Sequence, residues 1–321
     1  MDIAPGILSL IGHTPMLRLN RIARDVEAEV LVKIEYLNPS GSIKDRIALR
    51  MIEDAEKSGK LRPGMEVLDA STGNTAAALA FVGAVKGYRV RLLVPKVAAS
   101  EERLRIMKAY GAAVELIDAP IPGAQPTGGL HGDIVEKTPR ERCLEMEKAA
   151  PDKVWWARQF NSPSNVAAHR DGTGGEILRQ TDGKLDAFVA AVGTGGTLLG
   201  VAEALRAKIP SVRIIAVEPA ESQVLSRGKQ NLPTNPELAG GLVPRIIDEK
   251  TAERVIQITE PDAIAMAHRL AEEEGLYCGL SSGANVAAAL QVARELGRGQ
   301  RVVTLLVDSR DRYLFKEKFT T

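Results

Sequence analysis

Short apolar runs rich in Val, Ile and Leu alternate with longer amphipathic segments, and this alternation restricts the possible folds more than any other feature of the chain. The apolar runs are residues 30–34, 66–69, 89–94, 113–117, 187–192, 213–217 and 301–307. Apolar residues recur at helical spacing in residues 45–58, 101–110, 197–207 and 284–296. Continuous apolar runs are typical of strands buried on both faces, so the pattern predicts an α/β fold with mostly parallel sheets.

Two segments, residues 67–75 and 188–197, each lead from a predicted strand through a loop of small residues into a predicted helix. One such segment lies in each half of the 321-residue chain, whose length suggests about two domains. We therefore expect two α/β lobes with a ligand between them. Residues 118–133 are rich in Pro and Gly and should form a loop, which is either a mobile flap or a plain connection.

The charge balance and the cysteines exclude several classes of function. The chain has 42 basic and 41 acidic residues, so nucleic acids and anionic membrane surfaces are poor candidate partners. No apolar run is long enough to cross a bilayer and no signal-peptide pattern is present, so we expect a cytoplasmic protein. Cys143 and Cys278 lie outside any CxxC pair and are predicted to be packing residues. No metal site is expected, because the four histidines lack ligand spacing.

A glycine-rich loop, residues 193–197, follows a predicted strand and opens a predicted helix. Free backbone N–H groups at a helix start can bind a phosphate, but a tight turn that needs glycine fits equally well. Glu218, at the end of the next strand, also raises the possibility of a dinucleotide site. The spacing argues against that site, because the G-x-G-x-x-G fingerprint would need glycine in place of Leu198.

A lysine lies at the mouth of a predicted helix in residues 38–46, after a turn that contains Pro39 and Gly41. Lys44 could form a Schiff base if burial removes its proton, or it could simply be a solvated helix start. Residues 71–75 combine hydroxyls, an amide and backbone N–H groups at another helix start, which suits a carboxylate ligand or a simple N-cap. Residues 279–284 precede a helix of small residues and allow the same two interpretations.

Taken together and in this order, the motifs resemble the cysteine synthase family, that is the O-acetylserine sulfhydrylases and the catalytic core of cystathionine β-synthase. The likeness runs from residues 11–15 through residues 159–163 to residues 312–314. It implies fold type II of the pyridoxal-phosphate enzymes, a tryptophan synthase β-like fold of two lobes, each an open sheet flanked by helices. Residues 41–149 would form the smaller, mobile lobe, and residues 1–40 and 150–321 the larger, cofactor-binding lobe.

The resemblance also implies a role for each site residue. Lys44 would form the Schiff base with pyridoxal 5'-phosphate and later move the substrate's α-proton. Asn74 would bond the ring hydroxyl and Ser281 would face the pyridine nitrogen. The cofactor phosphate would be held by Gly193, Thr194, Gly195, Gly196 and Thr197. The substrate carboxylate would be held by Ser71, Thr72, Thr75 and Gln159.

The implied reaction is a β-replacement in which an activated serine, O-acetylserine by default, forms an α-aminoacrylate and sulfide or a thiol then adds to give L-cysteine. Three alternatives stay open: O-phosphoserine as donor, with Arg227 as its phosphate partner, serine with homocysteine, and a dehydratase or β-lyase that releases a keto acid. The family likeness implies a homodimer. Three stretches depart from the family pattern: residues 71–76, where the two hydroxyl residues are in exchanged order, residues 237–241 near the leaving-group pocket, and residues 307–311 near the cofactor ring.

Overall fold

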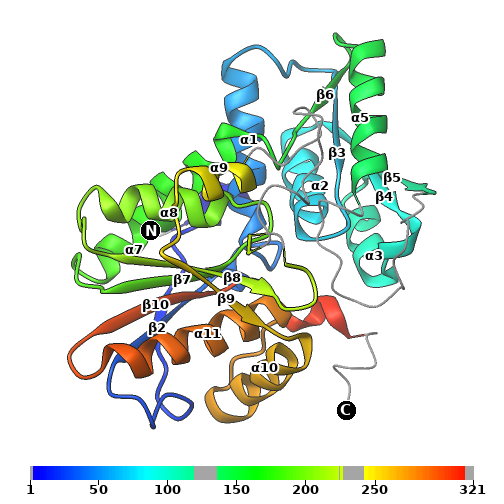
Figure 1. Ribbon diagram of the computed structural model, residues 1–321. Helices are drawn as coiled ribbons and strands as arrows, with labels where there is room; N and C mark the ends of the chain where they lie inside the picture. The colour runs from blue at the N-terminus through cyan, green and yellow to red at the C-terminus, as the bar shows by residue number, and fades with distance from the viewer. Residues whose placement is uncertain (1–2, 119–135, 224, 227–241, 315–321) are drawn as a thin grey trace.

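The computed structural model describes residues 3–118, 136–223, 225–226 and 242–314 of the chain. Within these ranges the strands form two sheets, as Figure 1 shows. The larger sheet has the strand order β1 (Met16–Arg18), β2 (Glu29–Ile34), β10 (Arg301–Leu306), β7 (Ala187–Ala191), β8 (Arg213–Pro219) and β9 (Arg254–Ile258). The smaller sheet has the order β5 (Ala113–Ile117), β4 (Arg89–Pro95), β3 (Glu66–Ala70) and β6 (Val154–Trp156).

Neighbouring strands run parallel in both sheets, apart from β1, which pairs antiparallel with β2 at one edge. The predicted α/β fold with mostly parallel sheets is therefore confirmed. Strand β10 shows why the runs are continuously apolar. Its successive side chains point to opposite faces of the sheet, and each face is covered by a hydrophobic core. Val302 and Leu306 pack on one face of the larger sheet, and Val303 and Leu305 pack on the other.

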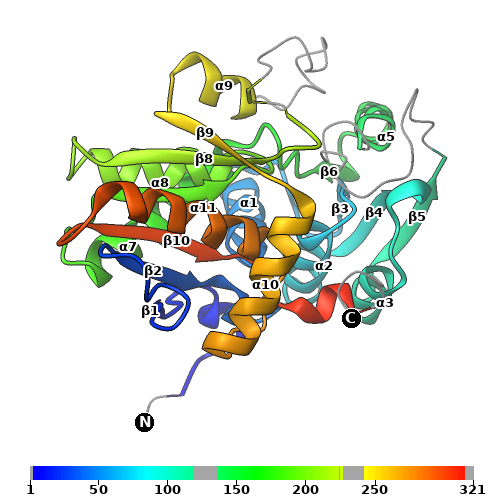
Figure 2. The ribbon, with the colours of Figure 1, turned by 60° about the horizontal axis from the view of Figure 1, so that its bottom comes forward.

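Helices cover both faces of each sheet, as Figures 1 and 2 show for the larger one. One face of the larger sheet carries α10 (Glu260–Glu274) and α11 (Leu280–Leu296). The other carries α6 (Pro163–Ala167), the π-helix η4 (Ala168–Gly174), α7 (Gly175–Gln180), α8 (Gly196–Arg206) and α9 (Leu242–Asp248). The smaller sheet packs between α1 (Lys44–Lys57), α2 (Asn74–Lys86) and α3 (Glu101–Ala109) on one side and α5 (Lys137–Ala149) on the other. Short 3₁₀ turns complete the described chain: η1 (Ile7–Leu10), η2 (Glu35–Leu37), η3 (Lys96–Ala98) and η6 (Arg310–Tyr313).

The structure differs from the sequence expectations at a few boundaries. Helix α11 begins at Leu280, four residues before the expected start, so Ser281 lies in its first turn. Strand β6 follows residue 149, yet it pairs with β3 in the smaller sheet. The division of the chain into lobes at residues 41 and 149 stays a proposal. In the ranges described, no helix is both long enough and apolar enough to cross a membrane.

Candidate active site

A cavity of about 330 Å³ lies where the ends of several parallel strands meet the starts of several helices. The cavity is lined by residues that follow β3, β7 and β10 and by residues from the first turns of α1, α2, α8 and α11. Ligand sites of open parallel sheets lie at this carboxyl edge, and their volumes are about 300–1,000 Å³. The cavity brings together ten of the residues predicted from sequence: Lys44, Ser71, Thr72, Asn74, Gln159, Gly193, Thr194, Gly195, Thr197 and Ser281.

Lys44 is the first residue of α1 and reaches the cavity from a tight turn. Gly41 has a φ of 86° in that turn, a left-handed conformation that favours glycine. Asp45 closes the turn by accepting a 2.7 Å hydrogen bond from the Ser40 N–H. Burial lowers the pKa of Lys44, and the carboxylates of Asp308 and Glu35 oppose that shift. This environment favours a reactive amine over a solvated helix start.

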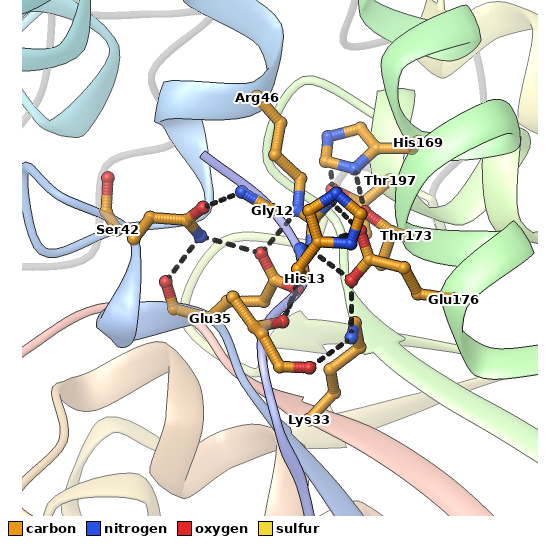
Figure 3. A network of polar contacts seen from close by, with 12 residues as sticks. Gly12, His13, Lys33, Glu35, Ser42, Arg46, His169, Thr173, Glu176 and Thr197 are labelled. Carbon is orange, nitrogen blue, oxygen red and sulfur yellow. Dashed lines mark hydrogen bonds and ion pairs between the residues drawn. The ribbon is translucent and has the colours of Figure 1, made fainter. Parts of the chain in front are cut away.

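The start of α1 is anchored to the larger sheet by a buried network of ion pairs, drawn in Figure 3. The Arg46 guanidinium, two residues after Lys44, donates paired hydrogen bonds of 2.7 and 2.8 Å to Glu35 and a second pair of the same lengths to Glu176. Lys33 Nζ lies 2.7 Å from Glu176 and is fully buried. Two cations and two carboxylates thus balance one another, and Arg46 and Lys33 hold the pKa of Glu176 down to about 2 against the effect of burial.

The glycine-rich loop has the geometry of an anion site. Gly195 precedes α8 with a φ of 94° and, as a glycine, has no side chain to cap the helix, while the Gly196 N–H makes a long 3.4 Å hydrogen bond to Thr194 Oγ1. Asn165 supports the loop by donating a 3.0 Å hydrogen bond to Thr194 Oγ1 and a 2.8 Å bond to the Gln159 carbonyl. A Cβ on Gly196 would lie 1.9 Å from Asn165 Oδ1, so glycine is required there for this close approach. Gly196 itself lies behind the wall of the cavity.

The loop at the start of α2 lies on the opposite wall. Helix α2 is preceded by Gly73, and in the described chain no side chain caps it, so the simple N-cap interpretation of Ser71 and Thr72 is not supported. The Thr72 N–H donates a 2.7 Å hydrogen bond to Glu136 Oε1. Thr75 lies behind the wall, where its hydroxyl donates a 2.5 Å hydrogen bond to Gln159 Oε1. Thr75 therefore holds Gln159, which does line the cavity.

Sequence reasoning did not find three buried polar residues that support these walls. Glu136 lines the cavity, and burial raises its pKa to about 8. Asp308 accepts a 2.7 Å hydrogen bond from Asn74 Nδ2, although the two residues are 234 positions apart. Asn165 holds the glycine-rich loop from α6. Each is a single polar residue without a local sequence signature, so only the packing of distant elements reveals it.

Several other expectations have a clear outcome. Cys143 and Cys278 are free, buried and part of hydrophobic cores, as predicted. The described residues contain no group of three or more His, Cys, Asp or Glu that could hold a metal. Glu218 accepts hydrogen bonds of 2.8 and 3.3 Å from the N–H groups of Leu225 and Ser226. Arg227 and residues 237–241 lie outside the described residues.

The residues present fit pyridoxal phosphate. The glycine-rich start of α8 suits the phosphate, the Lys44 amine suits the aldehyde, and Asn74 Oδ1 is buried without a hydrogen-bond partner among the described residues. The Ser281 hydroxyl, in the first turn of α11, lines the same cavity. Two mostly parallel sheets with this cavity between them define a pyridoxal-phosphate enzyme of fold type II.

Comparison with known proteins gives the family. The family described as "Pyridoxal-phosphate dependent enzyme" matches residues 7–308. Cysteine synthase of Staphylococcus aureus (strain N315) is 40% identical over 310 residues, which cover 96% of this chain and 95% of that protein. The chain belongs to the pyridoxal-phosphate dependent enzyme family and to its cysteine synthase group, and the dinucleotide alternative is wrong.

Solved structures support the same assignment. Cysteine synthase from Entamoeba histolytica matches with a TM-score of 0.86 at 36% identity, covering 100% of this chain and 92% of that one. O-ureido-L-serine synthase matches with a TM-score of 0.84 at 36% identity, covering 99% and 96%. The group therefore includes proteins named for different products, so the substrates of this chain need a separate argument.

Proposed function

We propose that this protein makes L-cysteine by β-replacement from O-acetylserine and sulfide. The observation that carries this proposal is that one cavity contains the Lys44 amine, whose pKa is lowered, and on its opposite wall the hydroxyls and helix start at residues 71–74. An amine can move a proton, and the hydroxyls and helix start on the facing wall can bind the carboxylate of an amino acid. The cysteine synthase relatives make this reaction the first one to test.

The proposed role of each residue follows from its position in the cavity. The cofactor, when bound, withdraws electrons from the α-carbon of the substrate. The Lys44 amine would hold the cofactor and would take the α-proton of the substrate. The substrate carboxylate is held by Ser71, Thr72 and Gln159, and Thr75 keeps Gln159 in place through its 2.5 Å hydrogen bond. Residues 193–197 would hold the phosphate, Asn74 would bond the ring oxygen, and Ser281 would face the ring nitrogen.

The charges of the cavity support a donor whose β-substituent is uncharged while it is bound. Among the described residues that line it, Lys44 is the only cation, whereas four carboxyl groups line it: Glu136, Glu218, Glu221 and Glu260. A dianionic phosphate ester would meet mostly like charges there, whereas an acetyl ester would not. This balance favours O-acetylserine over O-phosphoserine as the donor.

Steady-state assays with O-acetylserine, O-phosphoserine and serine, each with and without sulfide, test the proposal. A further arm supplies homocysteine with serine. We expect cysteine as the main product from O-acetylserine and sulfide, with the highest kcat/KM of all arms. Pyruvate as the main product with or without sulfide would identify a lyase or dehydratase instead. A higher kcat/KM for O-phosphoserine would overturn the donor assignment.

We also propose that the protein is a homodimer and that residues 41–149 form a smaller mobile lobe. Both features follow from the family likeness. Light scattering coupled to size-exclusion chromatography measures the mass in solution, and a mass near that of one 34.5 kDa chain would contradict the dimer. A cytoplasmic location stays a prediction.

A further inference from the structure

The π-helix η4 places His169 directly behind the glycine-rich loop. Short π-helical turns are rare and are often found at functional sites. His169 is 1% exposed and lies against α8, and a Cβ on Gly200 would come within 2.8 Å of the His169 Cβ. Glycine at position 200 therefore lets the imidazole approach the first turn of α8. Figure 3 shows the dashed contacts from the ring to Thr173 and Thr197.

Both ring nitrogens of His169 have a threonine partner. Nε2 lies 3.2 Å from Thr197 Oγ1, and Nδ1 lies 3.0 Å from Thr173 Oγ1. The pKa of His169 is well below its usual value because the ring is buried and because Lys44 and Arg46 add positive charge nearby. The ring is therefore neutral at physiological pH and carries a single proton, on one nitrogen or the other.

The hydroxyl of Thr173 decides which nitrogen carries that proton. Thr173 is fully buried, and within the described residues its hydroxyl has His169 Nδ1 as its hydrogen-bond partner. A buried hydroxyl donates its proton to an acceptor wherever one is in reach. Nδ1 is therefore the acceptor, and Nε2 carries the ring proton and donates it to Thr197 Oγ1.

We propose that His169 is a positioning residue that turns the Thr197 hydroxyl into a donor toward the cofactor phosphate. With one lone pair of Thr197 Oγ1 occupied by the His169 N–H, the hydroxyl proton is left to point into the cavity, which Thr197 lines. A phosphate only accepts hydrogen bonds, so the opposite tautomer would direct this proton away from it. The proposal rests on the proposed role of residues 193–197 as the phosphate site.

The test measures the dissociation constant of pyridoxal phosphate for the full-length protein, together with the ³¹P resonance of the bound phosphate. His169→Leu removes the donor at similar size, and we expect cofactor affinity to fall about tenfold and the ³¹P resonance to move. His169→Gln supplies an amide N–H in place of Nε2, so its affinity and resonance should return close to wild type. Thr197→Val should weaken binding as His169→Leu does, and adding His169→Leu to it should have less than about a twofold further effect.

The outcomes separate this proposal from the one it rests on. A Thr197→Val variant with unchanged cofactor affinity would overturn the assignment of the phosphate loop. An undiminished effect of His169→Leu in the Thr197→Val background, or a His169→Gln variant as weak as His169→Leu, would overturn the role of His169 while leaving the loop assignment intact. Either result would mean that the imidazole acts only through packing.

Discussion

Asn74 Nδ2 donates a 2.7 Å hydrogen bond to Asp308 Oδ2, which connects the start of α2, beside the smaller sheet, to the end of β10 in the larger one. The Tyr313 hydroxyl donates a second bond of 2.7 Å to the same oxygen. Asp308 is 1% exposed. One buried carboxylate thus fixes the orientation of the amide proposed to face the cofactor ring.

Asn74→Asp should make the contribution of this contact to the stability of the protein depend on pH. The variant places two carboxylates against each other, and like charges at such a distance raise the pKa of one of them. A carboxyl group with a raised folded-state pKa stabilises the fold below its unfolded pKa and loses that contribution as pH rises through the folded value. We expect the free energy of unfolding, measured in urea from pH 4 to 8, to fall with rising pH by about 1–3 kcal/mol relative to wild type.

The double variant Asn74→Asp/Asp308→Asn is the matched control for that measurement. It restores one amide and one carboxylate to the contact with their positions exchanged. Its stability should follow the pH dependence of the wild-type protein. A single variant with the same pH profile as wild type would show that the two side chains do not interact in solution.

Lys44→Ala should abolish covalent attachment of the cofactor. The purified variant should lack the yellow absorbance of the wild-type enzyme, and borohydride should leave its peptides without a cofactor label. Loss of a group that moves a proton in catalysis should lower kcat by about 10²–10⁴-fold. Lys57→Ala, at the exposed end of the same helix, should keep colour, label and rate. A yellow Lys44→Ala protein labelled at another lysine would refute the assignment.

Glu176→Gln should lower the free energy of unfolding, because the buried ion pairs stabilise the fold. It leaves Lys33 and one face of Arg46 without their carboxylate, and breaking a buried pair costs about 3–5 kcal/mol. The pKa of Glu176 is depressed to about 2, so its contribution is present above its unfolded pKa and is lost as pH falls toward 2. In the variant, the free energy of unfolding measured in urea should therefore fall less steeply than in wild type as pH is lowered from 7 to 3.

An exposed ion pair provides the control for Glu176. Glu249 pairs with Arg245 at 2.7 Å, and its side chain is 51% exposed. Glu249→Gln should change the free energy of unfolding by less than about 1 kcal/mol. The decrease in that free energy between pH 7 and 3 should be the same as in wild type. Equal losses in the two variants would show that burial adds nothing to the Glu176 pairs.

Glu136→Gln should remove a pH dependence of the free energy of unfolding that is opposite in sign to the one caused by Glu176. Burial raises the pKa of Glu136 to about 8, so the folded protein becomes less stable as pH rises from its unfolded pKa to 8. Gln keeps an oxygen for the Thr72 N–H but cannot ionise. Between pH 5 and 8 the variant should gain stability relative to wild type, by up to a few kcal/mol, because each unit of pKa shift is worth about 1.4 kcal/mol. Glu145→Gln, exposed on α5, should show no such trend.

The sequence predicted the sheets well because burial on both faces leaves a local signal. The run at 113–117 coincides with β5, and the other predicted strands differ from the observed ones by one or two residues at their ends. Strand β6 has three residues, too few for a pattern, and β9 is an edge strand in which only Ile256 and Ile258 are buried. The order of the strands depends on pairing between distant segments, which local patterns do not encode.

The same distinction applies to the site. Lys44 and the small-residue loops were predicted because each follows a strand or opens a helix in a recognisable motif. His169 lies in a π-helix that no local pattern indicated, and its partner Thr197 is 28 residues away. Asp308 lies in residues 307–311, a stretch that departs from the family pattern at other positions, and no role was predicted for it, because its contact with Asn74 exists only once the two sheets are in place.

The paired hydrogen bonds of Arg46 hold the first turn of α1 against the larger sheet. Helix α1 packs its Ile47 and Met51 into the core of the smaller sheet, yet its first turn is tied to Glu35 and Glu176 beside the larger one. A rotation of the smaller sheet would therefore pivot at that first turn. Lys44 would keep its distance from the glycine-rich loop, while residues 71–74 would swing across the cavity toward the amino acid.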